Sequence, residues 1–323
     1  MKVFDGHSDI WTDVTVRRLK GEDHILERYH LDRLRQGEIE GAIFVIWSDP
    51  PYDADPVTRT AEIQQCILDE TAECDQVVLC KNIAEIQQAI ADGKFYILLG
   101  VEGLSMVGDN LEVIDALYAF GARHCSLTWN EENTIATGVC GEESRGLTPF
   151  GESAVKRILS KKMLLDVSHL NEKSFWDVMN LATKPIIASH SNAKALCNVP
   201  RNLTDQQLLA IRDTGGIVGA NAFKPFIHND PTRHHVKDLV AQIAYIADKI
   251  GVEHTGFGFD FTEFLCQDTM DAFSSTDVPY VDGLEDASHV PTLLAEMKLA
   301  GFEEDEIQQI AGGNYHRLIE KVL

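Results

Sequence analysis

Histidine and carboxylate side chains stand directly after several short apolar runs of this sequence. His7 and Asp9 follow the first run and are two residues apart, and Glu102, His169 and His190 each follow a later run. On an extended chain, residues i and i+2 point to the same side, so His7 and Asp9 can reach one cation. Imidazole and carboxylate are common ligands of zinc and related divalent ions. The residue types therefore predict a metal site.

These five side chains are sufficient for two ions. Two cations held close together need a shared carboxylate or hydroxide between them to offset their repulsion. We expect one ion to be held by His7, Asp9 and Glu102. The second would be held by Glu102, His169 and His190, so Glu102 is the expected bridge. The open positions would hold a bridging water, and two zinc ions are the expected cofactor.

Each residue also has an ordinary structural explanation. Polar side chains commonly cap strand ends, so His7 and Asp9 alone indicate metal binding only weakly. A carboxylate such as Glu102 often belongs to a turn, although burying it would cost free energy without a cation or donor. Histidines after apolar strands are often core residues with satisfied hydrogen bonds. The metal hypothesis depends on all of these side chains ending different runs of one chain.

The elements that must position these residues are eight apolar runs of strand length. They are VF (3–4), AIFVIW (42–47), YILLGV (96–101), CSLTW (125–129), MLLDV (163–167), PIIA (185–188), IVGANAF (217–223) and TGFGFDF (255–261). Most are continuously apolar, as is typical of parallel strands covered on both faces. Residues 236–250 repeat apolar side chains at helical spacing and predict an amphipathic helix. Alternating strands and helices favour an α/β fold, a (β/α)8 TIM-type barrel, with a doubly wound open sheet and extra lobe as the alternative.

A barrel would bring all of these side chains to one face. Active sites of such barrels lie at the carboxyl ends of the strands and in the loops that follow. Asp260 ends the last run and is expected to act there as general base toward the bridging water. Two long loops, residues 130–150 and 262–289, belong to the same face. No linker rich in Pro, Ser or Gly divides the chain, so we expect a single catalytic barrel domain, residues 1–323.

Charge and cysteine content narrow the expected partners and location. The formal net charge of −23 repels phosphate backbones and anionic lipid, so neither nucleic acid nor a membrane surface is an expected partner. The seven cysteines form no CxxC pair, which indicates reduced thiols and a cytoplasmic location. The first residues lack the pattern of a signal peptide, and no uncharged stretch approaches the roughly 18 residues of a membrane span.

Ordered sequence blocks extend over nearly the whole chain: DGHSDI (5–10), VEGL (101–104), SLTWNEEN (126–133), GLTPFG (146–151), LLDVSH (164–169), SHSNAKAL (189–196), VPRNLTD (199–205) and GLEDASHVPTLL (283–294). Together these blocks resemble the renal, or membrane, dipeptidase family of zinc peptidases, which are amidohydrolase-like barrels. The chain looks like a soluble, bacterial-type relative.

The resemblance implies a dinuclear zinc barrel that hydrolyses the peptide bond of dipeptides, with the five ligands already named. It also implies that Arg201 pairs with the free carboxylate of the dipeptide, a role that suits the guanidinium fork. Asp260 matches the proton carrier of the family. Trp129 and Asn130, at the end of the fourth run, are expected at the substrate. Members of the family often pair through surface helices and loops, so a homodimer is a further expectation.

Two departures from the family pattern bear on the chemistry. The residue after LT at the end of the fourth run is a histidine in relatives of the mammalian enzyme and Trp129 here. An indole N–H donates one hydrogen bond but cannot become charged. The last run keeps Asp260, whereas Thr262 replaces a second aspartate. Hydrolysis of another amide, a lactone or an N-acyl amino acid therefore stays open, as does a non-catalytic barrel that binds small peptides.

Overall fold

The computed structural model of the protein describes residues 1–274 and 279–323. Nine strands form in those residues: β1 (Val3–Ser8), β2 (Ile39–Trp47), β3 (Val77–Cys80), β4 (Phe95–Glu102), β5 (His124–Ser126), β6 (Leu164–Asp166), β7 (Ile186–Ile187), β8 (Val218–Ala220) and β9 (Thr255–Phe257). Each of the eight predicted runs overlaps one of these strands. The sequence reading missed β3, a four-residue strand.

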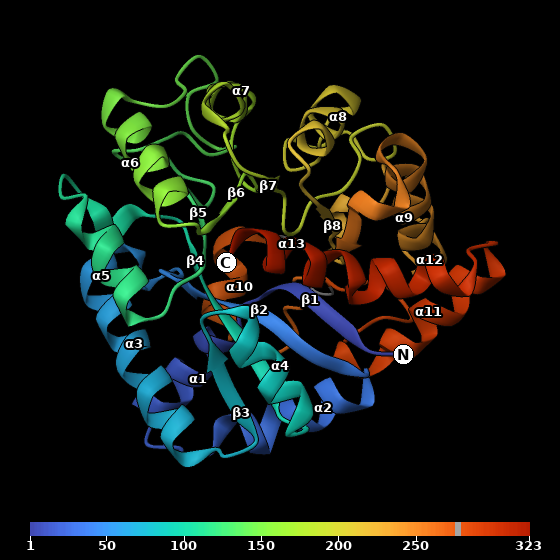
Figure 1. The fold of residues 1–323 in the computed structure, drawn as a ribbon, viewed down its shortest axis with the longest axis horizontal. Helices are drawn as coiled ribbons and strands as arrows, with labels where there is room; N and C mark the ends of the chain where they lie inside the picture. Colours follow the sequence, from blue (N-terminus) through green and yellow to red (C-terminus); the bar gives the residue numbers. More distant parts are fainter. Residues whose placement is uncertain (275–278) are drawn as a thin grey trace.

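Helices connect and surround the strands, as the alternation of runs predicted (Figure 1). Within the described residues they are α1 (Ile10–Leu19), α2 (Leu31–Gln36), α3 (Pro56–Glu73), α4 (Ile83–Ala91), α5 (Glu112–Phe120), α6 (Pro149–Ser160), α7 (Glu172–Leu181), α8 (Asp205–Asp213), α9 (Val236–Ile250), α10 (Gln267–Phe273), α11 (Val290–Leu299), α12 (Glu304–Gln308) and α13 (Asn314–Val322). The amphipathic helix predicted for residues 236–250 is confirmed as α9.

The strands pair in parallel and follow one another around a ring. The paired groups are β1-β2-β4-β3, β5-β6-β7 and β8-β9. Backbone hydrogen bonds join the groups: Arg123 N donates to Leu99 O at 2.8 Å beside β4 and β5, and Ala188 N donates to Ile217 O at 3.0 Å beside β7 and β8. Asp260 N donates to His7 O at 3.4 Å and links the last strand to the first. The predicted (β/α)8 arrangement is confirmed.

β3 is an addition outside that ring. It pairs with the first half of β4, from Phe95 to Leu98. The second half of β4 is left for the neighbourhood of β5, because Arg123 hydrogen-bonds to Leu99. A short apolar segment carries no periodicity that separates a strand from a buried loop, which is why the sequence did not predict it.

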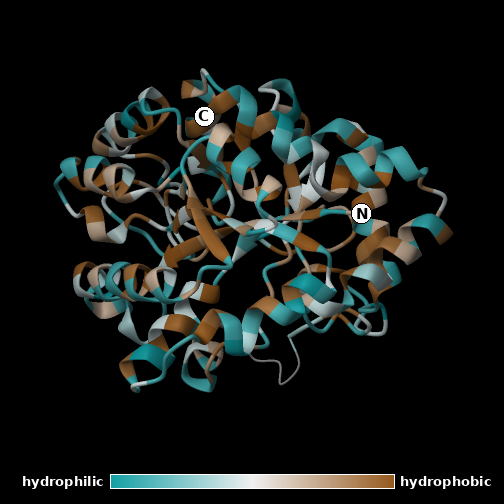
Figure 2. Ribbon diagram, turned by 60° about the horizontal axis from the view of Figure 1, so that its bottom comes forward, coloured by the Kyte–Doolittle hydropathy of each residue, from teal (hydrophilic) through white to brown (hydrophobic). Residues whose placement is uncertain are grey.

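Buried side chains fill the barrel and separate it from the helices. Along β2, Ile43 and Val45 belong to a cluster that also contains Phe4, Tyr96 and Tyr315, from β1, β4 and α13. The alternate residues of β2 pack in a different cluster, with side chains of α1 and α3. This period-two alternation places one face of the strand inside the barrel and the other against the helices. Figure 2 shows largely hydrophobic strands surrounded by helices that carry both hydrophobic and hydrophilic residues.

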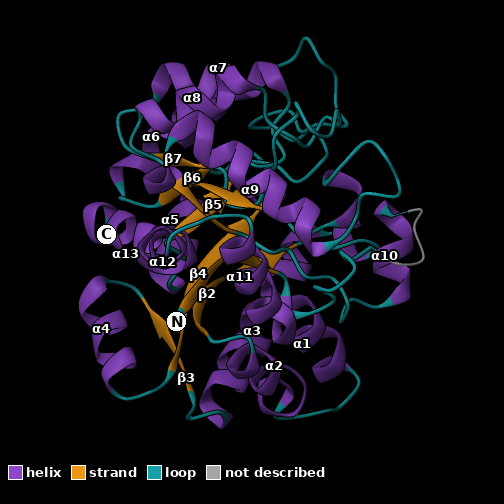
Figure 3. Cartoon of the chain, turned by 90° about the vertical axis from the view of Figure 1, so that its right-hand side faces the viewer, coloured by secondary structure: helices purple, strands orange, loops and turns teal. Residues whose placement is uncertain are grey.

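The longest irregular segments lie on the side of the strands that faces away from α13, as Figure 3 shows. The first predicted loop, residues 130–150, is irregular up to the start of α6 at Pro149. The prediction for residues 262–289 was wrong in part, because α10 forms there; residues 275–278 of that segment lie outside the described residues. None of the described helices has both the length and the apolar character needed to cross a bilayer.

Gly41 allows an aromatic ring to pack inside the barrel. It pairs directly with Tyr96 across β2 and β4, and a Cβ atom at Gly41 would overlap the Tyr96 ring. Tyr96 is fully buried, and its hydroxyl contacts His316 Nε2 at 2.6 Å, so the ring has little freedom to move away.

We therefore predict that Gly41→Ala lowers the free energy of unfolding by about 1–3 kcal/mol, the usual cost of overpacking a core. Urea denaturation measures it. Gly313→Ala is the matched control, because a Cβ there meets no atom closer than 3.4 Å and the residue is helical. The control should be neutral or slightly stabilising. Equal stability of the two variants would contradict the packing described for Tyr96.

Candidate metal centre

The carboxyl ends of the barrel strands bring the predicted ligands together. His7 lies in β1 and Asp9 follows it, and Glu102 is the last residue of β4. His169 and His190 lie three residues beyond the ends of β6 and β7. All five side chains are buried. The sequence reading placed them on one face, and the structure places them within a few ångströms of one another.

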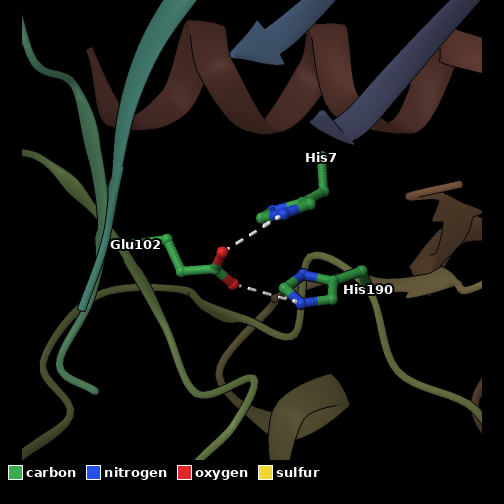
Figure 4. Close-up of side chains that lie close together, drawn as sticks. All are labelled: His7, Glu102 and His190. Atoms are coloured by element: carbon green, nitrogen blue, oxygen red, sulfur yellow. Dashed lines mark ion pairs between the residues drawn. The ribbon is translucent and has the colours of Figure 1, made fainter. Parts of the chain in front are cut away.

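Glu102 lies between two groups of histidines. Its Oε2 atom is 3.7 Å from His7 Nε2, whereas Oε1 is 2.9 Å from His169 Nε2 and 3.5 Å from His190 Nε2. Figure 4 shows the two oxygens directed to His7 and His190. The two ring nitrogens His169 Nε2 and His190 Nε2 are themselves only 2.8 Å apart. One carboxylate thus faces both halves of the cluster.

His7 is surrounded by acidic groups. Its Nε2 atom lies 3.6 Å from Asp9 Oδ2, 3.7 Å from Glu102 Oε2 and 3.9 Å from Asp260 Oδ1. Burial disfavours a charged imidazole, but the three carboxylates outweigh it and raise the pKa of His7 to about 10. Positive charge at this point is therefore strongly favoured.

Several buried polar atoms of the cluster lack hydrogen bonds, which is the expected signature of a cation site. Both ring nitrogens of His7 and Asp9 Oδ1 have no hydrogen-bond partner among the described residues. Orphaned buried polar atoms cost free energy unless a ligand satisfies them. The convergent donor groups are His7 with Glu102 and His190, and His7 with Asp9 and Asp260. The donor set fits divalent metal ions with mixed nitrogen and oxygen ligands.

Two residues of the centre adopt left-handed backbone conformations. His169 has a φ of 70° and Asp260 a φ of 58°. Side chains other than glycine rarely adopt this region, and such strain is concentrated at functional sites. In each case a turn after the strand directs the side chain to the centre. Residue types alone gave no sign of this conformation.

Asp260 is held by a neighbouring amide. Asn221 Nδ2 donates to Asp260 Oδ2 at 2.9 Å, which leaves Oδ1 on the side of His7. Burial raises the pKa of Asp260 above its usual value, and the charge of His7 counters it. The sequence reading missed Asn221, which stands inside the apolar run of residues 217–223 as its single amide.

Asp5 is a second residue that the sequence reading missed. Its Oδ1 atom accepts the backbone N–H groups of His7 at 3.2 Å and Phe259 at 2.9 Å, and so connects the start of the chain to the last strand. Burial raises the pKa of Asp5 to about 7. The signal was present, because Asp5 stands two residues before His7 in the DGHSDI block.

A cavity of about 50 Å³ adjoins the centre. Its walls are Asp9, Trp47, Glu102, Trp129, Asn130, His169, Arg201, Phe223, Phe226, Asp260, Thr262 and Leu265. Trp129 packs against Trp47 with ring centroids 5.2 Å apart. Arg201 is buried, and its Nη2 atom lies 3.1 Å from His169 Nε2. Asn130 lines the cavity and also contacts His169 Nδ1 through Oδ1 at 2.8 Å, a contact that the sequence did not predict.

Comparison with known proteins identifies the family. The model of the family described as "Membrane dipeptidase (Peptidase family M19)" matches residues 1–323. The chain belongs to this family. The predicted resemblance is thereby confirmed, and with it the enzyme class, since members of peptidase family M19 are metallo-dipeptidases.

Three relatives illustrate how far this M19 chain resembles known members. The "Uncharacterized protein in pqqA 5'region" of Klebsiella pneumoniae is 33% identical over 253 residues, which cover 76% of this chain and 88% of that protein. "Dipeptidase verJ" of Clonostachys rogersoniana is 28% identical over 344 residues, covering 99% and 84%. The solved metallo peptidase from Rhodobacter sphaeroides, liganded with a phosphinate mimic of the dipeptide L-Ala-D-Ala, has the same fold, with a TM-score of 0.87 and 24% identity over 100% of this chain and 99% of that one.

The orphaned donors predict that divalent metal stabilises the M19 fold. Zn²⁺ added to chelator-treated protein at one hundred times its Kd should add about 2.7 kcal/mol of stability. For a chain of this length that corresponds to a rise in melting temperature of roughly 5 °C. Differential scanning calorimetry measures it. His190→Ala should lose most of the rise. His234→Ala should keep it, because the His234 imidazole hydrogen-bonds to the backbone oxygen of His228 at 3.0 Å and lies outside the centre. An equal rise in both variants would place the metal elsewhere.

Proposed function

We propose that the chain hydrolyses the peptide bond of dipeptides at a dinuclear metal centre held by His7, Asp9, Glu102, His169 and His190. The observation that carries the proposal is the placement of Glu102, with Oε2 toward His7 and Oε1 toward both other histidines. A carboxylate with ligand groups on both sides is suited to bridge two ions. Zinc suits the mixed imidazole and carboxylate set.

In this proposal the metal ions would activate the water, and Asp260 would transfer its proton. When bound, the two ions would lower the pKa of a bridging water and polarise the scissile carbonyl. Asp260 Oδ1 is the oxygen not bound to Asn221, so it takes the proton of the attacking water and returns it to the leaving amine. Burial raises the pKa of Asp260, which makes the carboxylate a better proton acceptor.

Arg201 supplies the recognition of the substrate. Its guanidinium is buried in the wall of the cavity, and Nε has no hydrogen-bond partner among the described residues. A buried guanidinium with unused N–H groups is a strong site for a carboxylate. A carboxylate bound there fixes the distance from the C-terminus of the substrate to the metals, and so selects dipeptides over longer peptides.

Trp129 makes the other wall of the cavity apolar. The indole packs on Trp47 and cannot carry the positive charge of the histidine found there in relatives of the mammalian enzyme. We therefore assign Trp129 to contact with the substrate and not to charge stabilisation. Asn130, which binds His169, would support the metal ligand as well as line the site.

The proposal extends to the organisation of the chain. A single catalytic unit spanning residues 1–323 is supported by the span of the family match. A cytoplasmic location is supported by the free thiols of all seven cysteines. A homodimer remains a proposal from the family resemblance.

Glu102→Gln tests the dinuclear centre. The neutral amide cannot bridge two cations, so metal content should fall from two ions per chain to one or none. The value of kcat/KM for dipeptides should fall by roughly a thousandfold, on the order of 4 kcal/mol. Elemental analysis and steady-state kinetics measure both. Glu40→Gln is the control, because Glu40 is a partly buried carboxylate that lies 3.5 Å from His316 and outside the candidate centre. Two retained metals and full turnover in the Glu102 variant would refute the proposal.

A substrate panel separates the dipeptidase from its alternatives. L,L- and L,D-dipeptides should be hydrolysed faster than N-acyl amino acids and lactones, and chelator should abolish the activity. Faster turnover of the acylated compounds would favour the other amidohydrolase reaction. The absence of chelator-sensitive hydrolysis of any substrate would favour a peptide-binding barrel.

Arg201→Lys tests carboxylate recognition. Lysine keeps the charge but loses the fork, so KM for dipeptides should rise about tenfold, equivalent to roughly 1.4 kcal/mol. C-terminally amidated dipeptides should show no such change. Lys194→Met is the matched control, because Lys194 lies with Arg201 in the wall of a neighbouring cavity. The same loss for free and amidated substrates would argue against this role.

A further inference from the structure

A chain of buried polar groups extends from His190 away from the metal centre. His190 Nδ1 lies 2.7 Å from Ser189 Oγ, which in turn contacts Asp166 Oδ2. Asp166 Oδ2 also lies 3.0 Å from His124 Nε2. All four side chains are almost inaccessible to solvent. The proposed metal ligand His190 is thus connected from behind to a carboxylate that does not itself line the centre.

Asp166 acts as an acceptor in all of its contacts. Its Oδ1 atom accepts the backbone N–H groups of Ser168 at 2.8 Å and Ser189 at 3.0 Å. Burial alone would raise the pKa of Asp166, but hydrogen bonds from His124, Ser189 and Ser168 hold it at about 2. An ionised carboxylate only accepts hydrogen bonds, so both partners of Oδ2 must donate.

The negative charge of Asp166 sets the direction of each hydrogen bond between Asp166, Ser189 and His190. The hydroxyl of Ser189 has one proton, and that proton is committed to Asp166. Ser189 Oγ must therefore accept from His190 Nδ1–H. A neutral imidazole has a single N–H group, so Nε2 keeps its lone pair. That atom faces Glu102 Oε1 at 3.5 Å, inside the centre.

The second histidine shows the same orientation by a separate route. Arg201 can only donate, and its Nη2 atom lies 3.1 Å from His169 Nε2, which is therefore an acceptor. His169 Nδ1–H then donates to Asn130 Oδ1 at 2.8 Å. Two lone pairs face each other across 2.8 Å, an arrangement that needs a cation between them or beside them.

We propose that Asp166, acting through Ser189, is a positioning residue that sets the tautomer of His190 and so keeps its Nε2 lone pair available to metal. The inference rests on the proposed function, in which His190 is a metal ligand. Polar partners behind metal-bound histidines commonly fix the ring in this way.

The isosteric variant Asp166→Asn makes a specific prediction. The two backbone N–H groups at Oδ1 require the amide oxygen to stay there, so the amide nitrogen must replace Oδ2. That nitrogen donates to Ser189 Oγ, and the Ser189 proton turns to His190 Nδ1. The proton of His190 then moves to Nε2, where it blocks the metal. Ser189→Ala removes the connection without reversing it, so both tautomers are populated.

Two measurements on the full-length protein test the proposal. Competition with a chromophoric chelator should show Zn²⁺ affinity reduced about 10- to 100-fold by Asp166→Asn and by less in Ser189→Ala. Nitrogen-15 NMR of histidine-labelled, metal-free protein should show His190 protonated at Nδ1 in the wild type and at Nε2 in Asp166→Asn. Ser174→Ala is the control, because Ser174 is a buried serine that accepts a hydrogen bond from Thr137 N at 3.1 Å. It should match the wild type in both measurements.

Wild-type affinity in Asp166→Asn, an unchanged tautomer, or a larger loss in Ser189→Ala than in Asp166→Asn would overturn the proposal. If Asp166→Asn does not fold, the NMR spectrum of Ser189→Ala tests the proposal instead. Signals from both tautomers of His190 are expected there, and a single Nδ1–H signal would overturn the proposal. Failure of the proposed function would give a different experimental result from failure of the tautomer proposal. A wild-type protein that binds no Zn²⁺ while His190 is protonated at Nδ1 would refute the metal centre and leave the tautomer assignment standing.

Discussion

The concentration of negative charge at one end of the barrel is the constraint on which the rest of the structure depends. Asp9, Glu102 and Asp260 converge on His7 within 4 Å, in a region from which water is largely excluded. Removing carboxylates from water costs several kcal/mol each unless cations or donors compensate. Without metal, a proton on His7 supplies part of the compensation, which is why its pKa is so high. The surrounding structure is organised to hold these groups in place despite their repulsion.

Most of the fold and the convergence of the candidate site could be predicted from the sequence because both depend on local patterns. Every strand except β3 was visible as an apolar run, and each predicted ligand was visible as a polar residue at or just after the end of one. The barrel rule then placed those ends on one face. For the same reason β3 and α10 were missed, since a four-residue apolar segment and a seven-residue helix inside a long loop carry too little periodicity.

The supporting contacts could not be predicted, because they depend on which residues the folded strands bring together. Asn130 binds His169 and Asn221 binds Asp260 across 39 residues of sequence in both cases. Asp166 is visible in the LLDVSH block, but its proposed role depends on the direction of its hydrogen bonds. Spacing does not encode that direction. Residue types indicate the candidate ligands, whereas their tautomers and backbone strain come from the assembled barrel.

Tyr315 connects the two ends of the described chain to the support of the candidate centre. It enters the barrel from the last helix, packs 5.0 Å from Phe4 and donates a hydrogen bond to Ser189 O at 3.4 Å. The first strand and the last helix therefore meet in the barrel interior, directly beneath the backbone that leads into His190. The packing that supports the candidate centre thus extends to α13, a helix that does not itself line the cavity beside it.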